Sequence, residues 1–342
     1  MQDNPLPVGK LPHRLLADIL SSTPQIADDV VVGPGIGFDC AVVSMGDRYL
    51  VLKSDPITFV TDNLGWYLVQ VNANDLATTG ATPRWLLVTL LLPENATDAA
   101  YVIDLNSQIL HACQQLGIAV VGGHTEITYG LPRPLAIGTL VGEVAPDELV
   151  TPAGMRSGDR IILTKGVPIE ATAILAKEFS PSLRRALTAE ELQRATNYLF
   201  DPGIGVLRDA QTALAAGRIT AMHDPTEGGV SAALWEMAEA AEKTLRIDID
   251  SILVPSLASK VCDIFAVDPL SAIASGALLL TVDNEDVDAV LAALAVQQID
   301  AVVIGEVMEG PSSVWKQQAG KWVLLPRPER DAIALLFEQD SA

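Results

Sequence analysis

The chain has 342 residues, of which 49% are hydrophobic and only 5% aromatic, and its formal net charge is −21 at pH 7. A surface this acidic repels nucleic acids and anionic membranes, so we expect neither as a partner. Every long apolar run is interrupted by a charge or a break, so the sequence predicts no membrane span. The length predicts about two domains with a sizeable core.

The three cysteines, Cys40, Cys113 and Cys262, lie far apart in the sequence. This spacing argues against a disulfide framework or a structural zinc site and is typical of a reduced compartment. Prolines and a lysine precede any long apolar run at the N-terminus, so we expect no signal peptide and a cytoplasmic protein.

A glycine-rich turn follows a loose N-terminal arm, a short helix over residues 11–20 and an apolar run at residues 30–32. Gly33, Gly35 and Gly37 permit positive φ and close approach of the backbone. Such a turn can direct several N–H groups at one anion. An ordinary flexible loop would have the same composition, so the turn alone does not predict a binding site.

Two strands, residues 40–44 and 49–53, form a predicted hairpin around Met45–Arg48. Asp39 precedes the first strand and Asp55 follows the second, so the two carboxylates are neighbours at one end of an antiparallel pair. They repel each other unless a cation or a proton lies between them. The alternative is that both are exposed turn residues, which aspartate commonly is.

A helix is predicted over residues 63–79, with Gly80 as its C-terminal cap and Pro83 preventing its continuation. At 100° per residue, Asp75 falls in the middle of an apolar stripe, and Asn72 lies beside it. A carboxylate in an apolar layer costs several kcal/mol, by order of magnitude, unless a group pairs with it. Asp75 therefore either accepts hydrogen bonds from a loop or faces a cation or phosphate site.

The rest of the first half alternates strands and helices. A buried strand is expected at residues 84–92, a helix at 98–116, a strand at 118–121 and another at 135–144. Between the last two strands we expect a turn at residues 122–126. One sheet with two helices on one face is an α+β layer. Its other face is apolar, around Val42, Val51, Val88 and Ile137, so we predict a partner sheet and a homodimer.

A stretch rich in proline, glycine and charge at residues 145–159 predicts a boundary between domains 1–152 and 153–342. The second domain is a predicted mixed α/β layer. Its strands are expected at residues 160–164, 219–222, 246–249, 277–282 and 301–307, and its helices at 169–177, 189–199, 204–215, 230–243 and 287–295. The tail after residue 311 is expected to hold one short strand. Gly228 and Gly229 directly precede a helix, where a phosphate could bind.

Four motifs occur in one order along the chain: Gly37–Val42 (GFDCAV), Asn74–Pro83 (NDLATTGATP), Gly122–Glu126 (GGHTE) and Asp224–Gly229 (DPTEGG). In this order and spacing the chain resembles the aminoimidazole ribonucleotide (AIR) synthetase, or PurM-like, superfamily over about residues 11–310. Within it, the DPTxGG and ILTKG stretches are most similar to the hydrogenase-maturation protein HypE and to AIR-synthase-related proteins.

The resemblance implies two α/β domains, a homodimer whose N-terminal sheets form a barrel, and binding of ATP with Mg²⁺. It implies an enzyme that activates an amide-type oxygen of a small-molecule substrate or phosphorylates it; for HypE-type members it also implies a maturation partner protein. The implied metal ligands are Asp39, Asp55 and Asp75, and the implied catalytic residues are Glu126, Asp224 and His124, a candidate acid or base. The implied nucleotide-binding residues are Gly35, Gly37, Asn72, Asp75, Gly122, Gly123, Thr226, Gly228 and Gly229.

Three departures from the family pattern leave alternatives open. Phe38 replaces an acid of the first motif, Glu227 replaces the arginine of DPTRGG, and the chain ends at Ala342 without the terminal cysteine of HypE. The first two favour a binding or scaffold protein without turnover as an alternative to the enzyme. A kinase resembling thiamine-monophosphate kinase is the third hypothesis.

Overall fold

The structure is a computed structural model and describes residues 6, 9, 11–24, 27–58, 60–318, 320–334 and 336–337. Two compact units divide the chain. The N-terminal unit holds the described residues of 25–33 and 39–149. The C-terminal unit holds those of 150–342 together with 34–38 and the described part of 1–24. The domain boundary at residue 152 stays a prediction. The two short N-terminal segments, 34–38 and the described part of 1–24, belong to the C-terminal unit.

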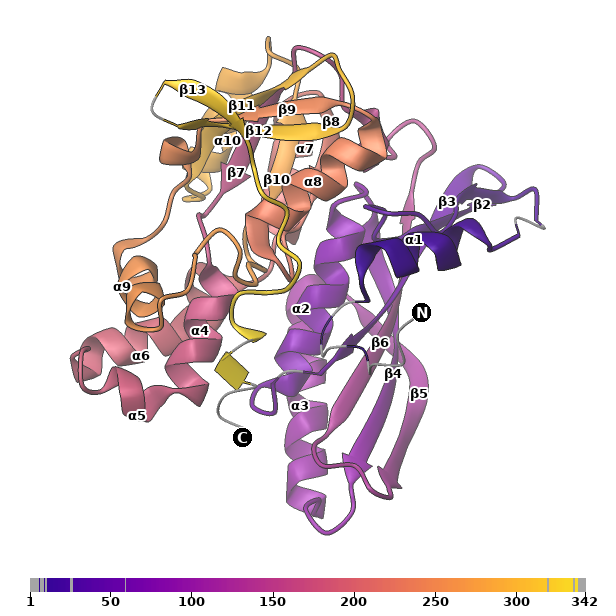
Figure 1. Cartoon of the computed structure of the whole chain (residues 1–342). Helices are drawn as coiled ribbons and strands as arrows, with labels where there is room; N and C mark the ends of the chain where they lie inside the picture. The colour runs from indigo at the N-terminus through magenta and orange to yellow at the C-terminus, as the bar shows by residue number, and fades with distance from the viewer. Residues whose placement is uncertain are drawn as a thin grey trace. The chain divides into compact units, whose positions relative to one another are not determined.

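The N-terminal unit is built on a six-stranded sheet with the order β1-β2-β3-β6-β4-β5 (Figure 1). The strands are β1 (Val30–Val32), β2 (Ala41–Met45), β3 (Arg48–Ile57), β4 (Thr82–Pro93), β5 (Ala119–Thr128) and β6 (Leu135–Val144). β2 and β3 form the predicted hairpin, and β3 continues in antiparallel register against β6. Because both acidic motifs flank this hairpin, its register positions Asp39 and Asp55.

Two helices pack on one face of this sheet, as the sequence predicts. Helix α2 (Leu64–Ala77) lies against β3, β6 and β4, and α3 (Ala99–Leu116) packs against α2. Asp98 caps α3 by accepting a hydrogen bond from the Tyr101 N–H at 2.8 Å, and Gly117 ends it in the left-handed conformation. In α2, 12 of 14 residues are buried. The helix is therefore buried on nearly all of its faces, rather than on one apolar face as an amphipathic surface helix is.

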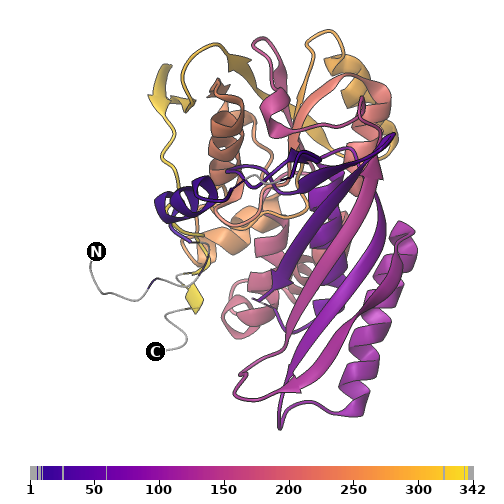
Figure 2. The same cartoon turned by 90° about the vertical axis from the view of Figure 1, so that its right-hand side faces the viewer.

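Among the described residues of this unit, no helix covers the other face of the sheet, and Figure 2 views the sheet from that side. The register places Trp85, Leu87 and Ile137 on this open face, where Trp85 and Leu87 are more than one-third exposed. Val42, Val51 and Val88 are instead buried. The prediction that these three residues lie on the open face is therefore wrong. Strand alternation puts these three against the helices.

Strand β5 differs from the prediction, which ended it at residue 121 and placed a turn at 122–126. The strand runs from Ala119 to Thr128, and Gly122 to Glu126 pair in parallel register with Leu87 to Leu91. Gly123 has φ of 149°, and a Cβ there would overlap the carbonyl group of Val88. The glycine pair therefore permits close pairing of two strands around an irregularity in register.

The C-terminal unit contains a seven-stranded sheet with the order β13-β12-β9-β11-β7-β10-β8. Its strands are β7 (Arg160–Thr164), β8 (Ile219–His223), β9 (Thr244–Ile247), β10 (Leu279–Val282), β11 (Ala301–Met308), β12 (Ser313–Gln318) and β13 (Lys321–Leu324). The neighbouring strands are antiparallel except β12 and β9, which are parallel. The tail thus forms a hairpin of two strands where we predicted one.

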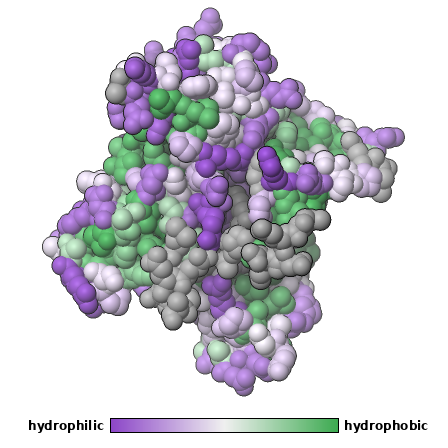
Figure 3. Space-filling model, in the orientation of Figure 1, coloured by the Kyte–Doolittle hydropathy of each residue, from purple (hydrophilic) through white to green (hydrophobic). Residues whose placement is uncertain are grey.

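Helices α7 (Leu207–Ala216), α8 (Gly229–Ala241) and α10 (Val287–Val296) pack against strands of this second sheet. The apolar residues Val230, Leu234 and Met237 of α8 are buried in the core. The unit also holds α1 (His13–Ser21) and a group of helices that pack on one another: α4 (Ile169–Glu178), α5 (Ser180–Leu183), α6 (Ala189–Asn197) and α9 (Ser256–Ile264). The surface in Figure 3 mixes polar and apolar residues, and apolar ones gather over the α4–α9 side of this unit. Among the described residues, no helix combines the length and apolar composition that crossing a membrane requires.

Candidate functional site

The N-terminal unit contains a buried ion pair at the predicted acidic site. The Lys53 Nζ atom lies 3.1 Å from Asp75 Oδ2 and 3.4 Å from Asp55 Oδ1. Lys53 and Asp55 are two residues apart on β3 and so share a face of the strand. Asp75 reaches the same ammonium group from the C-terminal half of α2. The structure therefore provides the cation that the sequence requires beside Asp75.

Charges in this cluster act strongly on one another. Burial lowers the pKa of Lys53, but Asp75, Asp55 and Asp39 outweigh burial and hold it above its ordinary value. For Asp75, burial raises the pKa, and Lys53 opposes that rise. Since Lys53 Nζ and Asp75 Oδ2 lie 3.1 Å apart, within the range of an ion pair, we take Lys53 to be charged and to stabilise the carboxylate.

The sequence requires a cation or a proton among these carboxylates, and the Lys53 ammonium group is that cation for Asp55 and Asp75. Asp55 and Asp75 both contact Lys53, and Asp39 acts on it electrostatically, so a shared role for the three carboxylates stays a prediction. The sequence contained the signal, since Lys53 and Asp55 alternate on one strand. A lysine at the end of a strand is commonly solvated, whereas the Lys53 side chain is only 16% exposed.

Asn72, a predicted nucleotide-binding residue, is fully buried and holds the two elements of the cluster together. Its Nδ2 group donates to the Leu68 carbonyl at 2.8 Å, and its Oδ1 atom accepts from the Asp55 N–H at 3.2 Å. Gly138 on β6 lies so close that a Cβ there would come within 2.6 Å of Asn72 Nδ2. Asn72 therefore fixes the end of β3 against α2.

His124 and Glu126, the predicted catalytic pair, lie on the edge strand β5. His124 Nε2 is 3.1 Å from Glu126 Oε2, and the two side chains are 63% and 49% exposed. The hydrogen bond from His124 lowers the pKa of Glu126, and a second from Thr128 adds to the effect. Within the N-terminal unit this pair is open to solvent, with Gly122 and Gly123 preceding it on the same strand.

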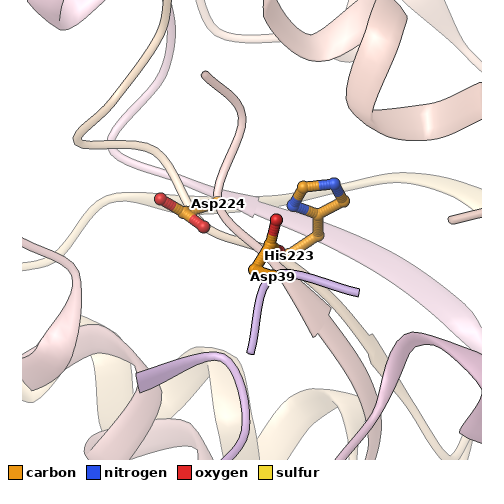
Figure 4. Close-up of side chains that lie close together, drawn as sticks. All are labelled: Asp39, His223 and Asp224. Atoms are coloured by element: carbon orange, nitrogen blue, oxygen red, sulfur yellow. The ribbon is translucent and has the colours of Figure 1, made fainter. Parts of the chain in front are cut away.

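In the C-terminal unit, β8 ends in His223 and is followed at once by Asp224. The two side chains leave the chain on different sides (Figure 4), and both are almost fully buried. His223 Nε2 lies 2.9 Å from Glu236 Oε2, which extends from α8. The strand end and the helix are thereby joined beside the turn of residues 224–229.

The turn before α8 already uses the N–H groups that we expected to bind phosphate. Gly228 and Gly229 have positive φ of 81° and 62°. The Gly228 N–H donates to Asp331 Oδ2 at 2.7 Å, and the Gly229 N–H donates to the Thr226 carbonyl at 2.9 Å. A phosphate at this helix end would therefore have to displace Asp331.

The first glycine-rich turn has a packing role in the same unit. Gly37 has φ of 76°, and a Cβ there would come within 2.7 Å of the Glu236 carbonyl oxygen and 3.2 Å of the Ala240 Cβ. The turn therefore lies directly on the backbone of α8. Gly35 packs beside the ring of Phe38, the residue that replaces an acid of the motif.

Two family models match the chain. The AIR synthase related protein N-terminal domain matches residues 37–144, and the C-terminal domain of the same family matches residues 156–316. Together they cover well over half of the chain. The chain belongs to the family of AIR synthase related proteins. The predicted PurM-like superfamily and its two-part α/β fold are thereby confirmed.

Several relatives of known description are hydrogenase-maturation proteins. A hydrogenase expression/formation protein of Methanocaldococcus jannaschii is 28% identical over 292 residues, which are 82% of each chain. A carbamoyl dehydratase HypE of Rhizobium leguminosarum is 28% identical over 285 residues, 80% of this chain and 77% of the relative. A solved structure of HypE in complex with ATP has a TM-score of 0.70 at 22% identity and covers 96% of this chain and 98% of its own.

Within this family fold, the residues that sequence reasoning missed come from outside the motifs. Glu236 lies in mid-helix, and Glu170 and Asp331 lie far from residues 224–229 in sequence. The carboxylates of Glu170 and Asp331 nevertheless interact electrostatically with Glu227 in that turn. No spacing rule connects them, because their proximity depends on the packing of α4 and the C-terminal segment.

Proposed function

We propose that this AIR synthase related protein is a Mg-ATP-binding enzyme that activates an amide-type oxygen of a small substrate or phosphorylates it. Membership of the family supports ATP use, and the names of the carbamoyl dehydratase relatives support the activation of an amide oxygen. The observation that carries the proposal is the cluster of Asp55 and Asp75 around a cation at the end of β3.

The donor set of this cluster fits Mg²⁺, which prefers carboxylate oxygens combined with substrate phosphates. Asp39, Asp55 and Asp75 would hold the ion, and the ion pairs of Asp55 and Asp75 with Lys53 support this assignment. When bound, Mg²⁺ supplies charge neutralisation for the phosphate oxygens. The Lys53 Nζ atom lies 3.1 Å from Asp75 Oδ2 and 3.4 Å from Asp55 Oδ1 and would neutralise further negative charge of the phosphates. Asn72 would keep the end of β3 in place.

We assign the remaining predicted residues to substrate and nucleotide contacts. Asp224 follows β8 directly and would orient the reacting group, with His223 and Glu236 as a supporting pair. Glu126 and His124 would contribute acid–base chemistry, which their hydrogen bond makes possible. Gly35, Gly37, Gly122, Gly123, Thr226, Gly228 and Gly229 stay predictions for nucleotide contacts.

We further propose a homodimer that covers the open face of the N-terminal sheet. Trp85 and Leu87 on that face are exposed apolar side chains of the kind that an obligate interface covers. The names of the hydrogenase-related relatives support a maturation partner protein as well. The three cysteines are buried free thiols, which supports a cytoplasmic location.

The test is binding of Mg-ATP to the purified protein, followed by turnover. Mg-ATP should raise the melting temperature of the wild type, because a ligand that binds the folded state stabilises it by mass action. Asp55→Asn should abolish that rise, whereas Asp104→Asn, on the exposed face of α3, should preserve it. ADP release that depends on a small amide or acid then identifies the substrate class. Absence of any stabilisation by ATP, ADP or their Mg²⁺ complexes contradicts the proposal.

A further inference from the structure

Three carboxylates act electrostatically on one another near the start of α8 in the C-terminal unit. Glu170 belongs to the first turn of α4, Glu227 to the turn before α8, and Asp331 to the C-terminal segment. Glu227 acts electrostatically on both other groups, and Asp331 acts on Glu170. We call these three residues the acidic triad.

Glu170 is the most buried member, with an exposed fraction of 5%. Ser275 donates hydrogen bonds to its carboxyl group from both the hydroxyl and the backbone N–H. Its Oε2 atom has no hydrogen-bond partner among the described residues. An oxygen of this kind costs free energy in a dry environment, so it marks a place where a donor is wanted.

The neighbouring acids do not satisfy that oxygen. Asp331 accepts from the Gly228 N–H at 2.7 Å and from the Ile333 N–H at 3.0 Å, so its carboxylate is already engaged. The charged groups that act on Glu170 most strongly are the acids Glu227 and Asp331. Burial, opposed by Ser275 and aided by these two acids, raises the pKa of Glu170 to about 7.

The geometry selects the kind of cation that fits. Among the described residues, the triad does not form a set whose oxygens all lie within 4.8 Å of one another, as a directly coordinated metal ion requires. Oxygens that are spread more widely suit a larger cation that carries several N–H donors. Glu227 and Asp331 are only partly buried, so the triad reaches solvent.

We propose that the acidic triad is a subsite for the positively charged end of a small ligand, an ammonium or guanidinium group, with Glu170 Oε2 as its buried acceptor. This deepens the proposed function, because it assigns a charge class to the substrate of the family's C-terminal unit. It does not depend on ATP, and its test is therefore carried out without nucleotide.

The competing explanation is structural. An acid in the first turn of a helix interacts favourably with the helix dipole, and Glu170 would then serve only to hold α4 against Ser275. In that case the carboxyl oxygens need no ligand. Replacing the acid would change stability and leave the binding of small cations unaffected.

The experiment measures binding of methylguanidinium by saturation-transfer NMR at pH 8 in low salt, with methylurea as the uncharged probe of the same shape. The wild type should bind methylguanidinium at least about tenfold more tightly than methylurea. Glu170→Gln should weaken methylguanidinium binding by at least about tenfold, and Glu227→Gln should weaken it several-fold. Glu178→Gln, an exposed position on the same helix, should have no effect.

Equal binding of the two probes by the wild type, or equal methylguanidinium binding by the wild type and Glu170→Gln, overturns the proposal. If Glu170→Gln does not fold, the comparison of Glu227→Gln with the wild type decides, since Glu227 is partly exposed. If the protein binds methylguanidinium but does not bind Mg-ATP, only the nucleotide proposal is refuted. Binding of Mg-ATP without methylguanidinium binding would refute the triad alone.

Discussion

Replacing Asp75 by asparagine should destabilise the protein in the absence of Mg²⁺ and nucleotide. The substitution keeps the side-chain shape and leaves the Lys53 ammonium, 16% exposed, with Asp55 as its closest remaining partner at 3.4 Å. Removing one partner of a buried pair costs about 3–5 kcal/mol. Because Asp55 still compensates part of the charge and the burial cost of Asp75 is relieved, we expect about 3 kcal/mol.

The assay is urea unfolding of the metal-free protein at pH 7, with the double variant Lys53→Met/Asp75→Asn completing a mutant cycle. The double variant should be more stable than the sum of the single variants predicts, by about 2 kcal/mol, since both charges are then absent. Arg84→Met, which removes an exposed ion pair with Glu143, is the matched control and should cost less than about 1 kcal/mol. An Asp75→Asn protein as stable as the wild type would refute the reasoning, because carboxylate repulsion would then dominate the cluster.

Three further substitutions test other parts of the structure. The folded-state pKa of Glu170 is about 7, above its ordinary value of 4.5. Its stabilising contribution to the free energy of unfolding is therefore fully present below pH 4.5 and is lost as the pH rises through 7. Relative to Glu170→Gln, the wild type should therefore lose about 3 kcal/mol of unfolding free energy between pH 5 and pH 8, and parallel pH profiles would contradict this. Leu87→Glu on the open sheet face should convert a dimer to a monomer in light scattering, and a dimer that persists argues for another interface. Gly123→Ala should lower the melting temperature by several degrees, because its Cβ overlaps the Val88 carbonyl; an unchanged melting temperature would mean that β5 is held less tightly.

The hairpin of β2 and β3, the helices α2 and α3 and the burial of Asp75 follow from periodicity and from chemistry that is local in sequence. Strand β5 does not, because two adjacent glycines indicate a turn unless the partner strand is known. The pairing of Lys53 with Asp55 follows from their alternation on one strand, but its pairing with Asp75 depends on how α2 packs on β3. The acidic triad combines residues 170, 227 and 331, and only the tertiary fold brings such distant positions together.

The short segment Pro34–Phe38 determines how the chain would behave after proteolytic cleavage between its two units. It packs on α8 through Gly37, yet it lies between two stretches of the N-terminal unit, 25–33 and 39–149. The chain therefore changes unit four times, after residues 24, 33, 38 and 149. A protease that cuts near residue 150 would leave the first fragment carrying part of the later unit. The two fragments should therefore stay associated and elute together in native chromatography. They should separate only in denaturant.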